Sequence, residues 1–348
     1  MHFIWFVSLA SCVQNVHRYS SEKLSMLYSI QIYRALAASA VVVFHLNPRV
    51  LPLGWVGVDM FFVVSGLIMG TVGLKEQPRE FLSKRLIRIV PLYWAATMAI
   101  ALLALTTTAF NTYKFHWDDL LRSLLFFPFV GYNGLIQPII RPGWTLNFEM
   151  FFYVTFAIGL SFKKPLIVCF TAITSLCILG YVFSPLAAPL QLWTAPLMIE
   201  FLLGLLISQI RFGDRIKVAL AVTALGILFL IIGFSVGENE NNIGIARVIT
   251  FGFPFALLML GSTALERAGV WPRIPLLEHL GDISYSLYLL HATVLAATVR
   301  FAGNGLVGQT MGILLSIGVA EASFRFFERP SRKYLQEFLR PRSRPLPA

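Results

Sequence analysis

The stretch RALAASAVVVFH, residues 34 to 45, carries an arginine and a histidine at the two ends of an otherwise apolar run. Eleven residues at about 100° each make about three full turns, so a helix would place Arg34 and His45 on one face, roughly 16 Å apart along its axis. The ten residues between them are apolar apart from one serine. This pattern predicts a transmembrane helix with one polar stripe.

Apolar runs of this kind recur along the whole chain. The 348 residues are 57% hydrophobic and only 13% charged, with a mean hydropathy of +0.73, whereas a typical soluble domain is about 25% charged. We therefore expect an all-α, polytopic membrane protein without a sizeable soluble domain. Measured against a bilayer core about 30 Å thick, the runs predict about ten transmembrane helices, at residues 27–47, 54–74, 90–110, 143–162, 165–183, 191–210, 216–236, 245–264, 282–302 and 305–325.

Basic residues gather in every second connection between these runs. Of the 28 lysines and arginines, 21 lie in the N-terminal segment, in alternate loops and in the C-terminal segment, and only six lie in the other loops. By the positive-inside rule, both termini and the basic loops are cytoplasmic. Because the basic residues are dispersed and lack interleaved aromatics, the net charge of +11 does not indicate a nucleic-acid partner.

The chain divides into an N-terminal extension at 1–26, one transmembrane domain at 27–335 and a basic cytoplasmic tail at 336–348. The early string LASC weakly resembles a lipoprotein cleavage box. No basic residue precedes that apolar run, so a peripheral extension or an upstream start before Met26 fits better. The longest outer connection contains FHWDDLLRSLLFFPF, which predicts an amphipathic or re-entrant segment. The three cysteines show no metal-ligand or disulfide spacing.

Six ionisable side chains fall inside the predicted spans, where each costs at least about 2.5 kcal/mol at the helix centre unless it finds a partner or a water-filled cavity. Any one of them alone could simply pair two helices. The predicted topology, however, places several in the outer half of the membrane, which favours a polar cavity running from the cytoplasmic side to the outer surface. The six are Arg34, His45, Asp59, Glu149, Glu200 and His291.

Two further spans carry polar stripes. The string PGWTLNFEMFFY places Thr145, Glu149 and Tyr153 on one face by four-residue spacing. The string ISYSLYLLH sets Ser284, Tyr288 and His291 along one face of the ninth span.

The third span begins with KRLIRIVPLYW, in which Arg85 and Arg88 are helical neighbours just before Pro91. Guanidinium forks bind phosphate oxygens bidentately, although a positive-inside anchor would need only the charge. The spacing leaves both interpretations open.

Taken together, these strings resemble the acyltransferase-3 family of bacterial membrane O-acyltransferases, particularly its ExoZ-type exopolysaccharide-production branch. The resemblance covers about residues 28 to 335 and rests on five features in the family's order: Arg34 with ten residues before His45, and the strings GWVGVDMFFVVSGLIMG, FLSKRLIRIVPLYW, PGWTLNFEMFFY and GDISYSLYLLHATV. One such string would be weak evidence, whereas five in order are strong.

The resemblance implies a multi-pass protein of the bacterial inner membrane, surrounded by membrane lipids. It implies transfer of an acyl group, usually acetyl, from acetyl-CoA to a hydroxyl of an exopolysaccharide or a lipid-linked oligosaccharide, without a metal. By the same resemblance His45 and Arg34 are essential, the pair Arg85 and Arg88 serves the acyl-CoA, and Glu149 and His291 belong to the active centre.

The chemistry needs a base, because a sugar hydroxyl is a poor nucleophile at neutral pH. His45 is the best-placed candidate, and Glu149 or Asp59 could orient its imidazole. Arg34 would hold a phosphate or the pantetheine arm of the donor. A covalent acyl-His45 intermediate is the rival mechanism.

Two other classes of membrane protein fit the sequence less well. Proton-coupled transporters and flippases of lipid-linked saccharides also use buried Arg, His, Asp and Glu, but the sequence shows no inverted repeat and no paired broken helices. A structural scaffold would not explain buried charges at several coordinated positions. The order of the motifs favours the acyltransferase.

Overall fold

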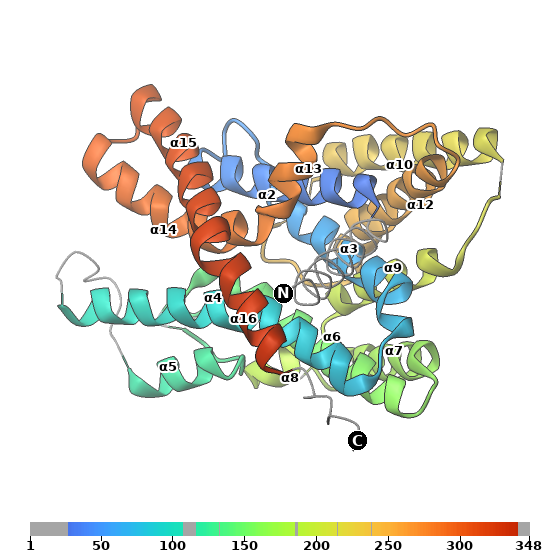
Figure 1. Cartoon of the computed structure of the whole chain (residues 1–348), viewed down its shortest axis with the longest axis horizontal. Helices are drawn as coiled ribbons and strands as arrows, with labels where there is room; N and C mark the ends of the chain where they lie inside the picture. Colours follow the sequence, from blue (N-terminus) through green and yellow to red (C-terminus); the bar gives the residue numbers. More distant parts are fainter. Residues whose placement is uncertain are drawn as a thin grey trace, which may run out of the picture.

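The computed structural model describes residues 27–106, 116–131, 133–184, 187–213, 215–237 and 239–339. Within these ranges the chain forms helices and no named strand, apart from one isolated bridge between Val130 and Ile136. The helices pack into one body, from which the hairpin of α14 and α15 projects at one end (Figure 1). The predicted all-α class is confirmed. The predicted extension at 1–26 and residues 340–348 of the predicted tail lie outside the described residues.

Helices occupy all ten of the predicted spans. The main helices are α2 (Tyr28–Leu46), α3 (Gly57–Thr71), α4 (Pro78–Thr106), α6 (Trp144–Ser161), α7 (Pro165–Phe183), α9 (Ile199–Gln209), α10 (Ile216–Val236), α12 (Phe253–Arg267), α14 (Ser284–Ala302) and α15 (Leu306–Ser323).

Shorter segments join or extend these helices. The α-helical ones are α5 (Trp117–Leu124), α8 (Ala188–Trp193), α11 (Ile245–Arg247), α13 (Pro275–Asp282) and α16 (Arg329–Phe338). Four single turns of 3₁₀-helix are η1 (Gly54–Val56), η2 (Gly73–Lys75), η4 (Arg141–Gly143) and η5 (Pro196–Met198), and two π-helical segments are η6 (Val248–Gly252) and η7 (Phe324–Glu328).

Seven helical stretches are long and apolar enough to cross a membrane: 28–46, 54–75, 78–106, 165–183, 216–236, 245–267 and 306–338. The predicted number of about ten is therefore not confirmed. Helices α6 and α14 fall short because they carry polar residues such as Glu149 and His291. The span predicted at 191–210 is divided into α8 and α9, with Pro196 at the start of η5 between them.

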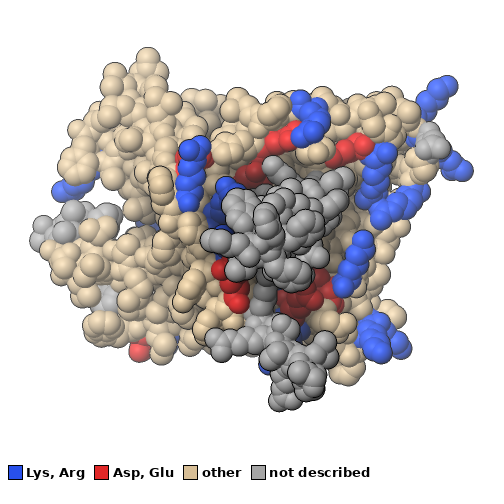
Figure 2. Space-filling view, viewed as in Figure 1, with Lys and Arg blue, Asp and Glu red and all other residues tan. Residues whose placement is uncertain are grey.

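The outer surface of the body is largely apolar, as a lipid-facing surface requires. Large side chains such as Leu102, Ile167 and Ile231 are about 60% exposed, at 61%, 59% and 58%. Lysines and arginines gather over the right-hand part of the face seen in Figure 2, whereas its left-hand part is almost free of charge. This separation of charge from apolar surface agrees with a membrane protein.

The core is closed by a tight crossing of α3 and α9. A Cβ atom built on Gly66 would lie 2.0 Å from the carbonyl oxygen of Phe201, and one on Gly204 would lie 2.1 Å from that of Val63. The Phe201 ring stacks on Phe62 at a centroid distance of 4.5 Å. Only glycine lets the two backbones approach this closely.

The start of α2 is fixed by a carboxylate from α12. Glu266 accepts hydrogen bonds from the backbone N–H of Tyr28 at 2.5 Å and of Ser29 at 2.9 Å, and from the Ser29 hydroxyl at 2.6 Å. These contacts satisfy donors that have no partner within the helix. They set the position of the helix that carries Arg34 and His45.

Candidate active site

A cavity of about 60 Å³ lies among α2, α3, α4, α6 and α14. Most of its lined surface is apolar, but polar side chains reach it from several helices, and it brings together Arg34, Arg88 and Glu149 of the predicted site residues. The polar lining residues are Arg34, Ser65, Arg88, Thr145, Glu149, Tyr153, Ser284, Tyr285 and Tyr288.

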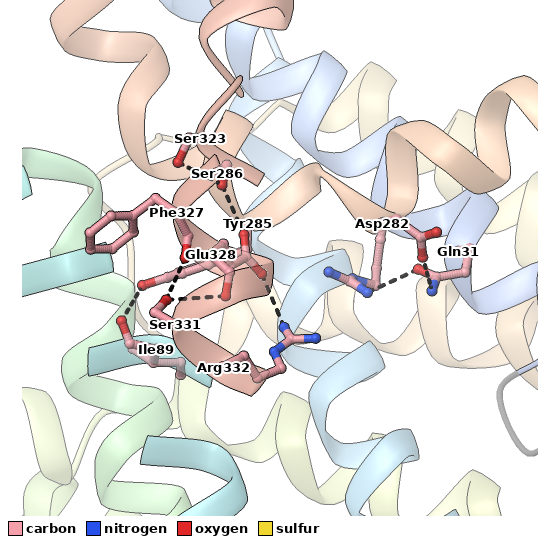
Figure 3. A network of polar contacts seen from close by, with 11 residues as sticks. Gln31, Ile89, Asp282, Tyr285, Ser286, Ser323, Phe327, Glu328, Ser331 and Arg332 are labelled. Carbon is pink, nitrogen blue, oxygen red and sulfur yellow. Dashed lines mark hydrogen bonds and ion pairs between the residues drawn. The ribbon is translucent and has the colours of Figure 1, made fainter. Parts of the chain in front are cut away.

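Arg34 reaches this cavity from the inner half of α2. The residue is only 6% exposed, and its Nη1 donates to Gln31 Oε1 at 2.9 Å. The Gln31 amide in turn donates from Nε2 to Asp282 Oδ1 at 2.8 Å, a bond drawn in Figure 3. The guanidinium is thus held by a neutral partner, and its charge remains available to a ligand in the cavity.

Arg85 and Arg88 have different surroundings, although they are neighbours on one helix. Arg88 lines the cavity and has no hydrogen bond or ion pair with another residue in the described part of the chain. Arg85 points to Glu76, with 3.4 Å between Nη2 and Oε2, and lies over the Phe81 ring at 5.3 Å. The structure therefore places Arg88 with Arg34, and Arg85 in an ion pair outside the cavity lining.

Glu149 and the other residues of the polar stripe on α6 form one wall of the cavity. The predicted alignment of Thr145, Glu149 and Tyr153 is confirmed, since all three line the cavity. Glu149 Oε1 accepts hydrogen bonds from the Ser65 hydroxyl at 2.9 Å and from the Tyr153 hydroxyl. Neither bond leads to His45, so Glu149 is not placed to orient that imidazole.

His45 instead lies against His291. His45 is exposed at the end of α2, whereas His291 on α14 is only 1% exposed. The two rings meet edge to face with centroids 5.0 Å apart, and His291 Nε2 lies 3.4 Å from His45 Nδ1. The sequence placed both histidines in the site but did not predict that they are each other's partner.

The backbone contacts of the two rings fix their tautomers. His291 Nδ1 lies 2.7 Å from the Tyr288 carbonyl oxygen, and His45 Nδ1 lies 2.9 Å from that of Val41. Because a carbonyl only accepts, both Nδ1 atoms carry the proton. His45 Nδ1–H is then shared between Val41 O and His291 Nε2. This leaves the lone pair of His45 Nε2 unprotonated, as a general base requires.

Tyr288 lies between the cavity and the two histidines. Its hydroxyl lies 3.1 Å from Thr145 Oγ1, and its ring contacts Phe61 at 5.4 Å and His291 at 6.0 Å between centroids. Tyr288 and Phe61 line the cavity, whereas neither histidine does. The continuous polar cavity expected from the sequence is therefore interrupted by these two rings.

Asp59 is placed away from the histidines. Both of its carboxylate oxygens accept from Arg247, from Nε and Nη2 at 2.8 Å each. Arg247 is 1% exposed, lies over the Trp55 ring at 4.5 Å, and donates from Nη1 to the Glu240 carbonyl. The expectation that Asp59 could orient His45 does not match this geometry, because both of its oxygens already bind a buried cation.

Arg247, at the start of the span predicted at 245–264, is not among the six ionisable residues singled out from the sequence. The structure places it at the end of α11, inside the body, with the buried Glu200 also acting on its charge. The sequence did contain a clue to this role, because the two acids Asp59 and Glu200 in predicted spans require a cation nearby. The five-residue π-helix η6 directly follows this arginine.

The fold and the site together define the class of this protein. It is a polytopic membrane protein with cationic and acidic side chains around a cavity and a pair of histidines nearby. The chain belongs to the acyltransferase-3 family: the family's acyltransferase domain matches residues 27–320. The resemblance seen in the sequence is confirmed. The chain is an acyltransferase, and no solved structure matches it.

The chain is similar to several named proteins. The chain is 32% identical over 298 residues to the exopolysaccharide production protein ExoZ of Rhizobium meliloti, covering 80% of the chain and 89% of that protein. It is 25% identical over 352 residues to the O-acetyltransferase OatA of Staphylococcus aureus, covering 86% of the chain and 56% of OatA. A putative O-acetyltransferase of the same species is 24% identical over 360 residues, with 90% and 58% covered. The chain thus spans little more than half the length of these staphylococcal relatives.

Proposed function

We propose that the protein is an O-acyltransferase of the bacterial inner membrane. It transfers an acetyl group from acetyl-CoA, bound from the cytoplasmic side, to a hydroxyl of an exopolysaccharide or its lipid-linked precursor. The observation that carries the proposal is that one helix, α2, presents Arg34 to a polar cavity and His45 to a second histidine beyond it. The names of the ExoZ and O-acetyltransferase relatives support a carbohydrate acceptor and an acetyl group.

Arg34 and Arg88 are assigned to the donor. Both line the cavity, and their guanidinium groups suit phosphate oxygens or the pantetheine carbonyls of an acyl-CoA. Arg85 is assigned to the approach to this site, where Glu76 holds it. Glu149 holds Tyr153 and Ser65 in the cavity wall and so positions the lining around the donor.

His45 is assigned as the base for the acceptor. Its Nε2 removes the proton of the sugar hydroxyl while the oxygen attacks the thioester carbonyl. The C–O bond forms, the C–S bond breaks, and the proton passes from His45 to the departing sulfur, which leaves as the free thiol. His291 Nε2 accepts from His45 Nδ1–H throughout, so it orients the base and stabilises the imidazolium.

The thioester has to pass Tyr288 and Phe61 to reach His45. Tyr288 and Phe61 line the cavity, whereas His45 and His291 do not, so a thioester that enters through this cavity reaches His45 by displacing at least one of the two rings. Side-chain rotation of this kind is a common part of substrate-induced closure or opening. It would also keep water from the thioester until the acceptor is bound.

Mass spectrometry of surface polysaccharide tests this proposal. Cells that lack the gene, cells with the wild-type protein and cells with His45→Ala are compared, with the amount of each variant in the membrane measured in parallel. We expect the polysaccharide to lose one acyl mass without the gene and with His45→Ala, while its export continues. Loss of export with unchanged decoration would instead support the transporter interpretation.

Labelling of the wild-type protein separates direct transfer from an acyl-His45 intermediate. Wild-type protein incubated with labelled acetyl-CoA and no acceptor would retain label on His45 if the intermediate forms. Direct transfer predicts no retained label, since the base then holds only a proton.

A further inference from the structure

The segment that follows the matched domain lies beside the candidate donor site. The family match ends at residue 320, and the chain continues through η7 and α16 to Phe338. In Figure 1, α16 crosses α4, and the two helices are in contact. Because α4 carries Arg88, residues outside the matched domain are near one wall of the cavity.

Glu328, the last residue of η7, ties this segment to α14. It is 4% exposed; its Oε2 accepts from the Ser286 hydroxyl at 2.8 Å and its Oε1 from Arg332 Nη2 at 3.0 Å (Figure 3). The neighbouring Tyr285 lines the cavity, and its hydroxyl donates to the Ile89 carbonyl on α4 at 2.7 Å. Glu328 therefore fixes Arg332 relative to both helices.

Arg34 lies among charged groups of both signs. Arg88 and Arg332 repel its guanidinium, whereas Glu328 and Asp282 attract it. Glu149 also lines the cavity, where Ser65 and Tyr153 donate hydrogen bonds to it. Neither Arg34 nor Arg88 forms an ion pair with an acid in the described part of the chain, and Arg34 bonds to the neutral Gln31. A ligand with several negative charges would give these two guanidinium groups the anionic partners that they lack.

We propose that Arg332, positioned by Glu328, is a third donor-binding cation that contacts a phosphate group of acyl-CoA. The inference rests on the proposed function for the identity of the donor. Arg332 is 35% exposed at its side chain, so a ligand can reach it while its ion pair with Glu328 persists. The donor site then includes a helix that follows the matched domain.

Equilibrium binding of two probes to purified full-length protein tests the role of Arg332. CoA carries the phosphates, whereas pantetheine has the same thiol arm without any. For Arg332→Gln we expect about tenfold weaker binding of CoA, the value of one charge-assisted hydrogen bond, and unchanged binding of pantetheine. Lys333→Gln removes an exposed charge at the next position of α16 and should bind both probes like wild type.

The outcomes separate the two proposals. Unchanged CoA binding by Arg332→Gln, or equal loss of CoA and pantetheine, overturns the role of Arg332 while the donor assignment stands. A wild-type protein that binds no CoA overturns both. If Arg332→Gln does not fold, Arg332→Lys replaces it: it keeps the charge but loses the planar fork, and we expect CoA affinity below that of wild type. CoA affinity equal to wild type would contradict the inference.

Discussion

At the scale of single residues, the proposed mechanism gives two histidines different roles. His45 has the free Nε2 and the exposed position, whereas His291 is buried and accepts from His45 Nδ1. Removal of a general base should lower kcat more than removal of a residue that only orients the base. The two histidines can therefore be distinguished by measuring the activity of a variant at each position.

His45→Ala should lower kcat by roughly 10²- to 10⁴-fold, the usual contribution of a general base. His291→Ala should cost about tenfold, because it removes one hydrogen bond to the base and leaves Nε2 in place. Neither change should alter the apparent KM for acetyl-CoA, since the donor is bound by Arg34 and Arg88. Steady-state kinetics of purified variants measure both numbers, and equal losses at the two positions would contradict the assigned roles.

The buried ion pair of Asp59 and Arg247 is predicted to be structural. Arg247→Ala leaves a carboxylate unpaired in the interior, which costs roughly 3–5 kcal/mol of stability. Thermal unfolding in detergent should show a large loss, and the protein that remains folded should keep its donor affinity. Glu278→Gln breaks the exposed pair with Arg273 and should change stability by less than about 1 kcal/mol. A stable Arg247→Ala protein without donor binding would place this arginine in the active site instead.

Some of the site could be predicted from sequence and some could not. The stripe of Glu149 follows from local helical spacing, so it was found. The partner of Asp59 lies 188 positions away in the chain, and periodicity within one helix carries no information about it. The different surroundings of Arg85 and Arg88 could not be predicted either. Helical spacing does not show that Arg85 forms an ion pair with Glu76.

At the scale of secondary structure, hydropathy located the helices but not their irregularities. Continuous apolar runs predict where a helix crosses, since backbone groups in lipid have to bond internally. The π-helical segments η6 and η7 leave no such signal, although each carries or adjoins a buried charge, Arg247 or Glu328. Irregular turns of this kind often occur at functional sites.

The crossing of α3 and α9 supplies a test of packing. Gly204→Ala places a methyl group against the backbone of α3 and should destabilise the protein by roughly 1–3 kcal/mol. Gly318→Ala on α15 has open space around its Cβ and should be neutral or stabilising, because alanine is the better helix former. Folded yield and thermal unfolding in detergent measure both. Equal stability of the two variants would contradict the close crossing.

At the scale of the whole molecule, the account places donor and acceptor on opposite sides of the membrane. The basic loops mark the cytoplasmic side by the positive-inside rule, and Arg34 lies nearer that side than His45 along α2. In the proposed mechanism the acyl group passes Tyr288 and Phe61, which line the cavity at Arg34, while the bulk of the donor stays on the cytoplasmic side. Sidedness is therefore part of the mechanism.

The most direct test uses sealed membrane vesicles of defined orientation and labelled acetyl-CoA. Inverted vesicles expose the cytoplasmic side, and they keep the native acceptor enclosed. We predict label in carbohydrate for inverted vesicles with wild-type protein, and none for right-side-out vesicles or for inverted vesicles with His45→Ala. Equal labelling from both orientations, or undiminished labelling with His45→Ala, would contradict the account.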